Sequence, residues 1–275
     1  MQKNALAEKE IDSIADQLID TALHIRGAID NMDSVTRRAK THGLNVPTNQ
    51  YELDVLADNI VHDDFSNFSG YVVSEEREVN EAEVKNSLLL LVVDPVDGST
   101  NASHGLGYWC FSAALVYNGN VVAGVVVDQV TGRIFRATEH GGATLTLPTG
   151  TVRSLDSLQF RQEDVGTIAD SFASSTICFT SHGASPHIFR HLRNFGASAL
   201  AICDVASGGF DAYIDDDDVM LKPWDILAAL YIAQRSGCTV LRRDSDDIMA
   251  PTGVLVSRSE TLLSDFQTLF PDFFH

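Results

Sequence analysis

The most chemically suggestive part of this sequence is a run of six apolar residues that leads directly into two carboxylates. Residues 88–105 read LLLLVVDPVDGSTNASHG, so Asp94 and Asp97 follow the apolar run almost at once. A continuous apolar run bounded by turn residues is typical of a buried strand. Pro95 blocks regular pairing beyond it. The two carboxylates are therefore expected at the end of a strand, where side chains can converge on a cleft.

The residues after Asp97 could bind an anion. Gly98 allows a tight bend, and Ser99 and Thr100 could begin a helix whose free N–H groups face that anion. Carboxylates beside such a site would repel a phosphate unless a cation lay between them. Because Asp and Glu oxygens are hard ligands, the cation should be Mg²⁺ or Mn²⁺ and not zinc.

Two further acidic motifs fit a metal site. Glu75 and Glu76 follow an apolar strand in VVSEER, and Asp225 begins a helix in KPWDILAA. Taken alone, an acidic pair after a strand is usually a solvated turn, and an Asp at a helix start is usually a cap. Together with the first motif, they indicate one metal cluster built from distant parts of the chain.

Hydrophobic periodicity predicts the elements that would position these residues. Apolar residues at three- and four-residue spacing predict helices over residues 5–33 and 51–65. From residue 71 the pattern is that of strands, with Asn118-Gly119 as a hairpin turn. The segment at residues 141–145 should belong to the same β meander.

The second part of the chain mixes helices and strands. Strands are predicted at 176–181, 238–241 and 253–257, and helices at 185–195, 199–209 and 225–237, the last two closed by glycine. No internal repeat or low-complexity linker separates the elements. We therefore expect two closely packed halves, residues 1–150 with the first acidic motifs and residues 151–275 with Asp225 and substrate contacts.

Composition excludes several classes of protein. The chain has 38 acidic and 19 basic residues, a net charge of −19, and no basic patch that could neutralise nucleic-acid phosphates. No apolar run approaches the roughly 18 residues that span a bilayer, and the first residues lack a secretory signal. Four cysteines without C-x-x-C spacing predict reduced core thiols. A cytoplasmic protein without membrane or nucleic-acid partners is expected.

The chain resembles the inositol monophosphatase family, the lithium-sensitive, magnesium-dependent phosphomonoesterases. DPVDGSTN is similar to the family signature D-P-[IL]-D-G-[ST]-x-N, and SEE and WDILAA resemble its two other metal motifs. NFGASALAICDVASGGFDAYID is similar to a later family helix, and the order of the motifs matches over roughly residues 45–257. The resemblance implies an α+β fold, a layered αβαβα sandwich of the sugar phosphatase type, and a homodimer.

The resemblance also implies which residues bind ligands. Two or three Mg²⁺ ions, replaceable by Mn²⁺, are expected on these residues: Glu75, Glu76, Asp94, the carbonyl of Val96, Asp97 and Asp225. The phosphate is expected on Gly98, Ser99 and Thr100. The rest of the substrate is expected near Gly196, Ala197, Ser198 and Asp215.

Catalysis is expected to proceed by direct attack of a metal-activated water, without a phosphoenzyme. The resemblance assigns the water to Asp54, Ser99 and Glu75, which would orient and deprotonate it. Asp54 is preferred because Asp54-x-x-x-Asp58 keeps the family spacing, although Glu52 is a rival.

The substrate and the reaction class leave alternatives. Ala102 in DGSTNASHGL resembles the archaeal-type branch that accepts inositol 1-phosphate and fructose 1,6-bisphosphate. Alternatives in the same family are 3′-phosphoadenosine 5′-phosphate and histidinol phosphate. A haloacid dehalogenase type phosphatase is disfavoured because its aspartates are two apart, whereas Asp94 and Asp97 are three apart. A non-catalytic metal- or phosphate-binding protein is a further alternative. The acidic run at residues 215–218 is either a solvated loop or a contact for substrate hydroxyls through Asp215.

Overall fold

The fold is seen in a computed structural model that describes residues 6–41, 50–156, 167–175, 189–215, 221–243 and 247–269. The helices are α1 (Glu8–Asp30), α2 (Ser34–Arg38), α3 (Glu52–Asp64), α4 (Glu81–Asn86), α5 (Ser99–His104), α6 (Ser198–Ala206), α7 (Pro223–Arg235) and α8 (Glu260–Leu269), with a 3₁₀ turn at Ile168–Asp170. Nowhere along these residues does a helix combine the length and the apolar character needed to cross a membrane.

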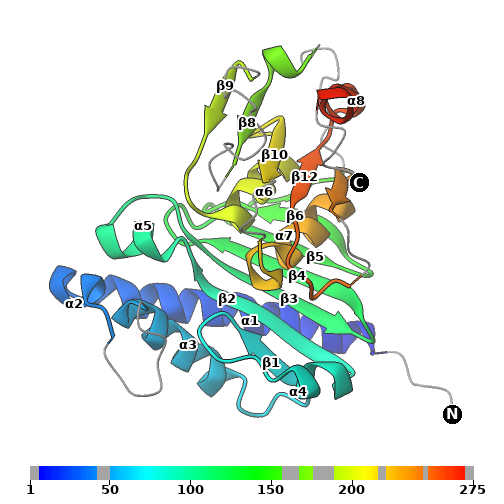
Figure 1. The fold of residues 1–275 in the computed structure, drawn as a ribbon. Helices are drawn as coiled ribbons and strands as arrows, with labels where there is room; N and C mark the ends of the chain where they lie inside the picture. The colour runs from blue at the N-terminus through cyan, green and yellow to red at the C-terminus, as the bar shows by residue number, and fades with distance from the viewer. Residues whose placement is uncertain are drawn as a thin grey trace, which may run out of the picture.

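The strands form two sheets (Figure 1). The first sheet has the order β1-β2-β3-β4-β5-β6-β7, with the strands Tyr71–Ser74, Leu89–Asp97, Cys110–Tyr117, Asn120–Asp128, Ile134–Thr138, Gly142–Thr146 and Val152–Ser154. The second sheet has the order β11-β12-β10-β8-β9, with the strands Thr239–Arg242, Val254–Ser257, Ala212–Asp215, Phe172–Ser174 and His191–Arg193.

The elements stack in five layers, which confirms the predicted αβαβα sandwich (Figure 1). Helices α1 and α3 pack on one face of the first sheet, and α6 and α7 pack on its other face. The second sheet covers α6 and α7, and α8 packs on its outer side. Three clusters of buried apolar side chains fill the spaces between these layers.

The sequence pattern explains the outer layer of helices. The α1 residues Ile11, Leu18 and Ile25 are almost completely buried at seven-residue spacing, so they form one stripe against the first sheet. Trp109 is buried in the same apolar cluster between these helices and the first sheet, as is usual for a core aromatic residue. Burial of such a stripe stabilises the helix far more than its intrinsic propensity does.

Several local predictions are confirmed. Asn118 and Gly119 have φ of 50° and 77° and join β3 to β4, as a two-residue hairpin turn requires. The predicted helices over 199–209 and 225–237 correspond to α6 and α7, and Gly237 follows α7 with φ of 88°. The described cysteines, Cys110, Cys203 and Cys238, are free and buried.

One predicted helix is wrong in the part that the structure describes. Within the expected helix at 185–195, residues His191–Arg193 form the edge strand β9, paired in parallel with β8. The Ser175 N–H donates to the Arg193 carbonyl at 2.9 Å, so pairing with a neighbouring strand outweighs the local helical pattern. The predicted strand at 176–181 lies outside the described residues.

The two halves expected at residues 1–150 and 151–275 correspond only loosely to the layers. The first sheet ends at Ser154 and the second begins at Phe172. Helix α7, from the later half, packs directly on strands β3 and β4 of the earlier sheet. The division into two halves therefore stays a prediction.

Candidate active site

Two of the acidic motifs meet because β1 and β2 are parallel neighbours. The register pairs Ser74 with Val93, and the Glu75 N–H continues it by donating to the Val93 carbonyl at 3.2 Å. Parallel strands end at the same edge of a sheet. Glu75 and Asp94, the next residue on each strand, therefore lie side by side.

Helix α7 brings the third carboxylate to the same place. Carboxylate oxygens of Glu75, Asp94 and Asp225 all lie within 4.8 Å of one another, although their positions in the chain span 150 residues. Asp225 is the third residue of α7, and its Oδ2 accepts from the Lys222 N–H at 2.7 Å. This capping contact holds the side chain at the helix start and leaves Oδ1 for a ligand.

Asp97 lies nearby but is held by a different element. Its Oδ1 accepts from the Ser198 N–H at 3.2 Å, and its Oδ2 accepts from the Ala199 N–H at 2.8 Å. Both donors belong to the first turn of α6, whose positive end favours a carboxylate. Asp97 Oδ2 also accepts from the Cys110 thiol at 3.5 Å, whereas Oδ1 keeps a second lone pair, through which Asp97 can still bind a cation.

The four carboxylates are electrostatically unfavourable by themselves. Desolvation of its carboxylate, and then repulsion by Asp225, raises the pKa of Glu75 to about 7, although the residue as a whole is exposed. Burial raises the pKa of Asp225 to about 6, and burial with repulsion by Asp225 raises that of Asp97 to about 8. Burial, with repulsion by Glu75, raises the pKa of Asp94 well above its usual value.

A divalent cation would relieve this repulsion. All the converging groups are oxygens, the ligands that Mg²⁺ and Mn²⁺ prefer, and neither Cys nor His takes part in the cluster among the described residues. The Val96 carbonyl, a predicted ligand, accepts from the Ser99 hydroxyl at 2.9 Å. The chemistry of these residues therefore fits a hard divalent metal.

Asp54 lies close to the cluster, since its charge acts on both Glu75 and Glu76, and its preference over Glu52 as the catalytic carboxylate stays a prediction. The Asp54 side chain is 3% exposed, and its Oδ2 accepts from the Tyr51 N–H at 2.8 Å. Its Oδ1 is buried without a protein partner in the described structure. Burial raises the pKa of Asp54, and the nearby Ser99 hydroxyl opposes that rise. An unpaired buried oxygen beside a hydroxyl is suited to hold a water molecule.

Glu76 contacts Gln50 and does not belong to the group of three carboxylates. Its carboxylate and its carbonyl both accept from the Gln50 side chain. Burial, followed by repulsion from Asp54, raises the pKa of Glu76 to about 8. Gln50 was not predicted as part of the site, and no sequence signal marks it.

Asp58 is a second residue that the sequence did not assign a role. Its Oδ1 accepts from the Ser74 hydroxyl at 2.7 Å, and its Oδ2 accepts from Arg77 Nε at 2.5 Å. Ser74 and Arg77 flank the Glu75-Glu76 pair, so Asp58 fixes the turn that carries the predicted metal ligands. In the sequence, the four-residue spacing between Asp54 and Asp58 was the signal that could have marked Asp58 as part of the site.

Gly98 permits the close packing at the start of α5. It has φ of 94°, and a Cβ there would lie 3.1 Å from the Trp109 Cβ and 3.3 Å from the Ala197 Cβ. Ser99 and Thr100 follow in the first helical turn, where N–H groups have no acceptor within the helix. The predicted phosphate-binding positions are thus adjacent to Asp97.

The predicted substrate residues lie at two places. Gly196, Ala197 and Ser198 form the entry to α6, next to Gly98 and Asp97. Asp215 ends β10, is 1% exposed and accepts from the Tyr213 hydroxyl at 3.3 Å. The remainder of the acidic run at 215–218 lies outside the described residues.

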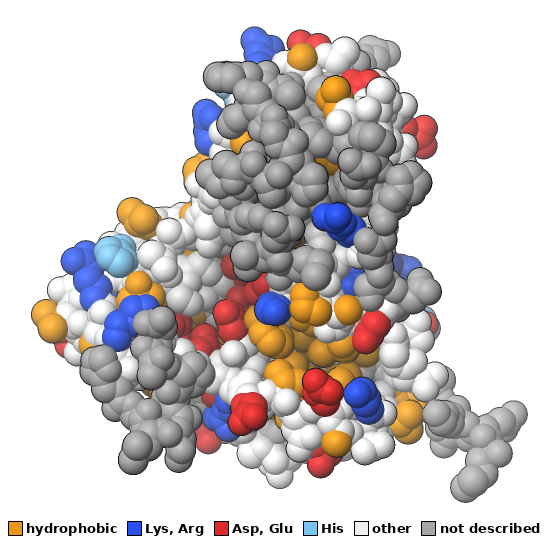
Figure 2. Space-filling model, viewed as in Figure 1, with side chains coloured by type: hydrophobic (Ala, Val, Ile, Leu, Met, Phe, Trp, Pro, Cys, Tyr) orange, Lys and Arg blue, Asp and Glu red, His pale blue; other side chains and the backbone are white. Residues whose placement is uncertain are grey.

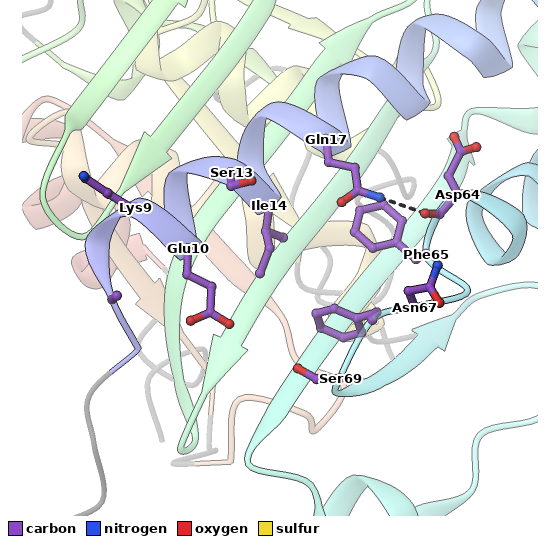
Figure 3. A pocket seen from close by; sticks show the side chains of 11 residues that line it. Lys9, Glu10, Ser13, Ile14, Gln17, Asp64, Phe65, Asn67 and Ser69 are labelled. Atoms are coloured by element: carbon purple, nitrogen blue, oxygen red, sulfur yellow. Dashed lines mark hydrogen bonds between the residues drawn. The ribbon is translucent and has the colours of Figure 1, made fainter.

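Asp and Glu side chains gather near the centre of the molecular face shown in Figure 2, beside an apolar surface. A groove of about 940 Å³ beside Asp225 is lined by apolar residues such as Val84, Trp224 and Met249 and by charged residues such as Lys222 and Asp247. Figure 3 shows a different hollow, between α1 and the loop after α3, in which Gln17 donates to the Asp64 carbonyl at 2.7 Å. That hollow lies at the amino end of β1, whereas Glu75 follows its carboxyl end.

The chain is similar in sequence to a known protein family and to several curated proteins. The profile of the inositol monophosphatase family matches residues 8–269. A chloroplastic phosphatase of Arabidopsis thaliana is 30% identical over 187 residues, 65% of this chain and 48% of that protein. An inositol-1-monophosphatase of Synechocystis is 28% identical over 172 residues, 60% of this chain and 56% of that protein. The chain thus spans about half the length of these two curated relatives.

Solved structures agree in fold. SuhB of Mycobacterium tuberculosis aligns with a TM-score of 0.72 and 19% identity over 98% of both chains. An inositol monophosphatase from Anabaena aligns with a TM-score of 0.71 and 19% identity, covering 96% of this chain and 97% of that one. With a family profile that matches almost from end to end, the chain belongs to the inositol monophosphatase family.

Proposed function

We propose that this protein is a metal-dependent phosphoric monoester hydrolase acting on a small polyol or sugar phosphate. The observation that carries the proposal is the convergence of Glu75, Asp94 and Asp225 within 4.8 Å, beside Asp54 and the start of α5. Family membership supports the same reaction class. A purely structural role would not account for so many carboxylates with raised pKa at one point.

The metal in this proposal is Mg²⁺, with Mn²⁺ as a substitute. Glu75, Asp94 and the Val96 carbonyl would hold one ion, and Asp94, Asp97 and Asp225 would hold a second. A looser third ion would be reached through Glu75 or Glu76. When bound, such ions supply water of lowered pKa and stabilise the charge on the leaving oxygen.

The chain itself positions the water and accepts its proton. The proposed acceptor of the water proton is Asp54 Oδ1, which is buried and has no protein partner in the described structure. The Ser99 hydroxyl lies near Asp54 and contacts the Val96 carbonyl. A hydroxyl group donates one hydrogen and can accept another. In the structure that hydrogen is donated to the Val96 carbonyl. Rotation of the hydroxyl toward Asp54 would let Ser99 donate to Asp54 and accept from the water, and Glu75 faces the same space.

The phosphate would lie on the N–H groups of Gly98, Ser99 and Thr100, and the alcohol part toward Gly196, Ala197 and Ser198. Asp215 would accept hydrogen bonds from substrate hydroxyls. Inositol 1-phosphate and fructose 1,6-bisphosphate, the pair used by the archaeal-type branch, are the proposed substrates. The alternative substrates, which other members of the family use, are 3′-phosphoadenosine 5′-phosphate and histidinol phosphate.

Phosphate release from this panel, with and without EDTA, tests the proposal. We expect turnover that needs added Mg²⁺, is inhibited by lithium and is highest on the first two substrates. The Glu81→Gln variant removes an exposed carboxylate paired with Lys85 at 3.5 Å and is the matched control. Turnover that survives chelation would refute the metal assignment. A trapped phosphoaspartate would instead support the dehalogenase type, and absent turnover with intact Mn²⁺ binding a non-catalytic protein.

The proposed cellular setting follows from the cysteines. Three buried, unpaired cysteines among the described residues agree with a reducing compartment, and we place the protein in the cytoplasm. A homodimer is proposed from the family, and light scattering of the purified protein would test it.

A further inference from the structure

Asn101 joins α5 to the segment that leads into α6. Its Nδ2 donates to the Tyr108 carbonyl at 2.7 Å and to the Phe195 carbonyl at 2.5 Å. An amide NH₂ group has two hydrogens, so both bonds can form at once. One side chain thereby ties together backbone segments that are 87 residues apart in the sequence.

The tied segment continues directly into the groups that hold Asp97. Phe195 is followed by Gly196, with φ of 75°, and then by the first turn of α6. The Ser198 and Ala199 N–H groups of that turn donate to the two Asp97 oxygens. A shift of the entry to α6 would therefore move both donors relative to Asp97.

The remainder of α6 has its own anchors. Near its carboxyl end, Asp204 accepts from the Tyr108 hydroxyl at 2.9 Å and from Arg133 Nη1 at 2.6 Å. The helix is also buried along its whole length. Loss of the Asn101 side chain should therefore loosen the first turn of α6 while the helix stays in place.

We propose that Asn101 is a positioning residue for the second metal ion. It fixes the first turn of α6, and the two backbone N–H groups of that turn fix the Asp97 carboxylate. It touches neither substrate nor metal. This inference rests on the proposed metal site, in which Asp97 belongs to the second ion and not to the first. The two ions should therefore respond differently when Asn101 is changed.

The test is a Mn²⁺ titration of the purified protein followed by electron paramagnetic resonance, in which free Mn²⁺ is counted directly. For wild type we expect at least two bound ions. For Asn101→Ala we expect the affinity for one ion, the one that Asp97 holds, to fall about three- to tenfold, the range for one or two lost hydrogen bonds. The affinity for the ion that Asp97 does not hold should be unchanged. Asn101→Asp keeps the side-chain shape but replaces the donor by an oxygen facing two carbonyls, so its effect should be at least as large.

Asn31→Ala is the matched control. Asn31 Nδ2 donates to the Gly27 carbonyl at 2.7 Å at the end of α1, so the variant loses a bond of the same kind outside the site. Its titration should equal that of wild type. Unchanged Mn²⁺ binding in both Asn101 variants, or equal weakening of both ions, would overturn the positioning role. A wild-type protein that binds fewer than two ions would overturn the proposed metal site itself.

Discussion

The exchange of Asp54 for asparagine separates the proposed proton acceptor from its surroundings. The carboxylate is almost fully buried, one oxygen accepts from the Tyr51 N–H, and the other has no protein partner in the described structure. An asparagine has the same shape and keeps an oxygen for the Tyr51 N–H. It loses only the basic oxygen that faces Ser99.

The expected loss of activity follows from this role. Removal of a positioned general base costs about 10²- to 10⁴-fold in rate, or about 3 to 5 kcal/mol of barrier. We expect Asp54→Asn to lower kcat by this amount with little change in KM, since Asp54 lies outside the proposed contacts to substrate. The assay is steady-state phosphate release at saturating Mg²⁺.

The stability of the same variant has a definite sign. Burial raises the pKa of Asp54 in the folded protein above its unfolded value of about 3.9. The group therefore stabilises the fold fully below that unfolded pKa and loses this contribution as the pH rises through the folded pKa. At pH 7 the variant should melt at the same temperature as wild type or higher, so that unfolding cannot explain the lost activity.

Glu52→Gln is the matched control, because Glu52 lies in the first turn of the same helix. It should retain wild-type kcat. If Asp54→Asn kept more than a tenth of wild-type kcat, the assignment of Asp54 would be refuted. If Glu52→Gln were the inactive variant, the base would be Glu52.

Three further predictions concern the metal cluster and the start of α5. Asp94→Asn should reduce turnover to background and weaken Mn²⁺ binding, measured by phosphate release and by calorimetric titration, because Asp94 is the ligand proposed to be shared by both ions; wild-type Mn²⁺ affinity would contradict this. In EDTA, melting temperature should fall as the pH rises through about 6 to 8, since the raised folded pKa values of Glu75, Asp97 and Asp225 mean that protonation stabilises the fold below that range. Mg²⁺ should restore more stability at pH 8 than at pH 5.5, and calorimetric scans with equal gains at both pH values would argue against the cluster. Gly98→Ala should lower the free energy of unfolding by about 1 to 3 kcal/mol in chemical denaturation and reduce activity, because it combines positive φ with close packing. Gly119→Ala has positive φ but open space, so it should cost less and leave activity unchanged.

Local signals in the sequence were sufficient for the elements that carry the site. The apolar run before Asp94, the Asn118-Gly119 turn and the first turn of α7, which contains Asp225, each depend on preferences that act within a few residues. The family resemblance then named the acidic positions. Such short-range preferences failed at β9, where a strand partner outside the segment decided the conformation.

The meeting of the site residues was decided by the tertiary structure. The parallel register of β1 and β2 sets Glu75 beside Asp94, and the packing of α7 on the first sheet adds Asp225. Asp97 contacts α6, and Gln50 contacts Glu76. These segments are far apart in the sequence, and no local pattern predicts that they lie close together in space. The physical reason is that a local pattern determines what a segment becomes, whereas strand pairing and burial between layers determine which segments meet.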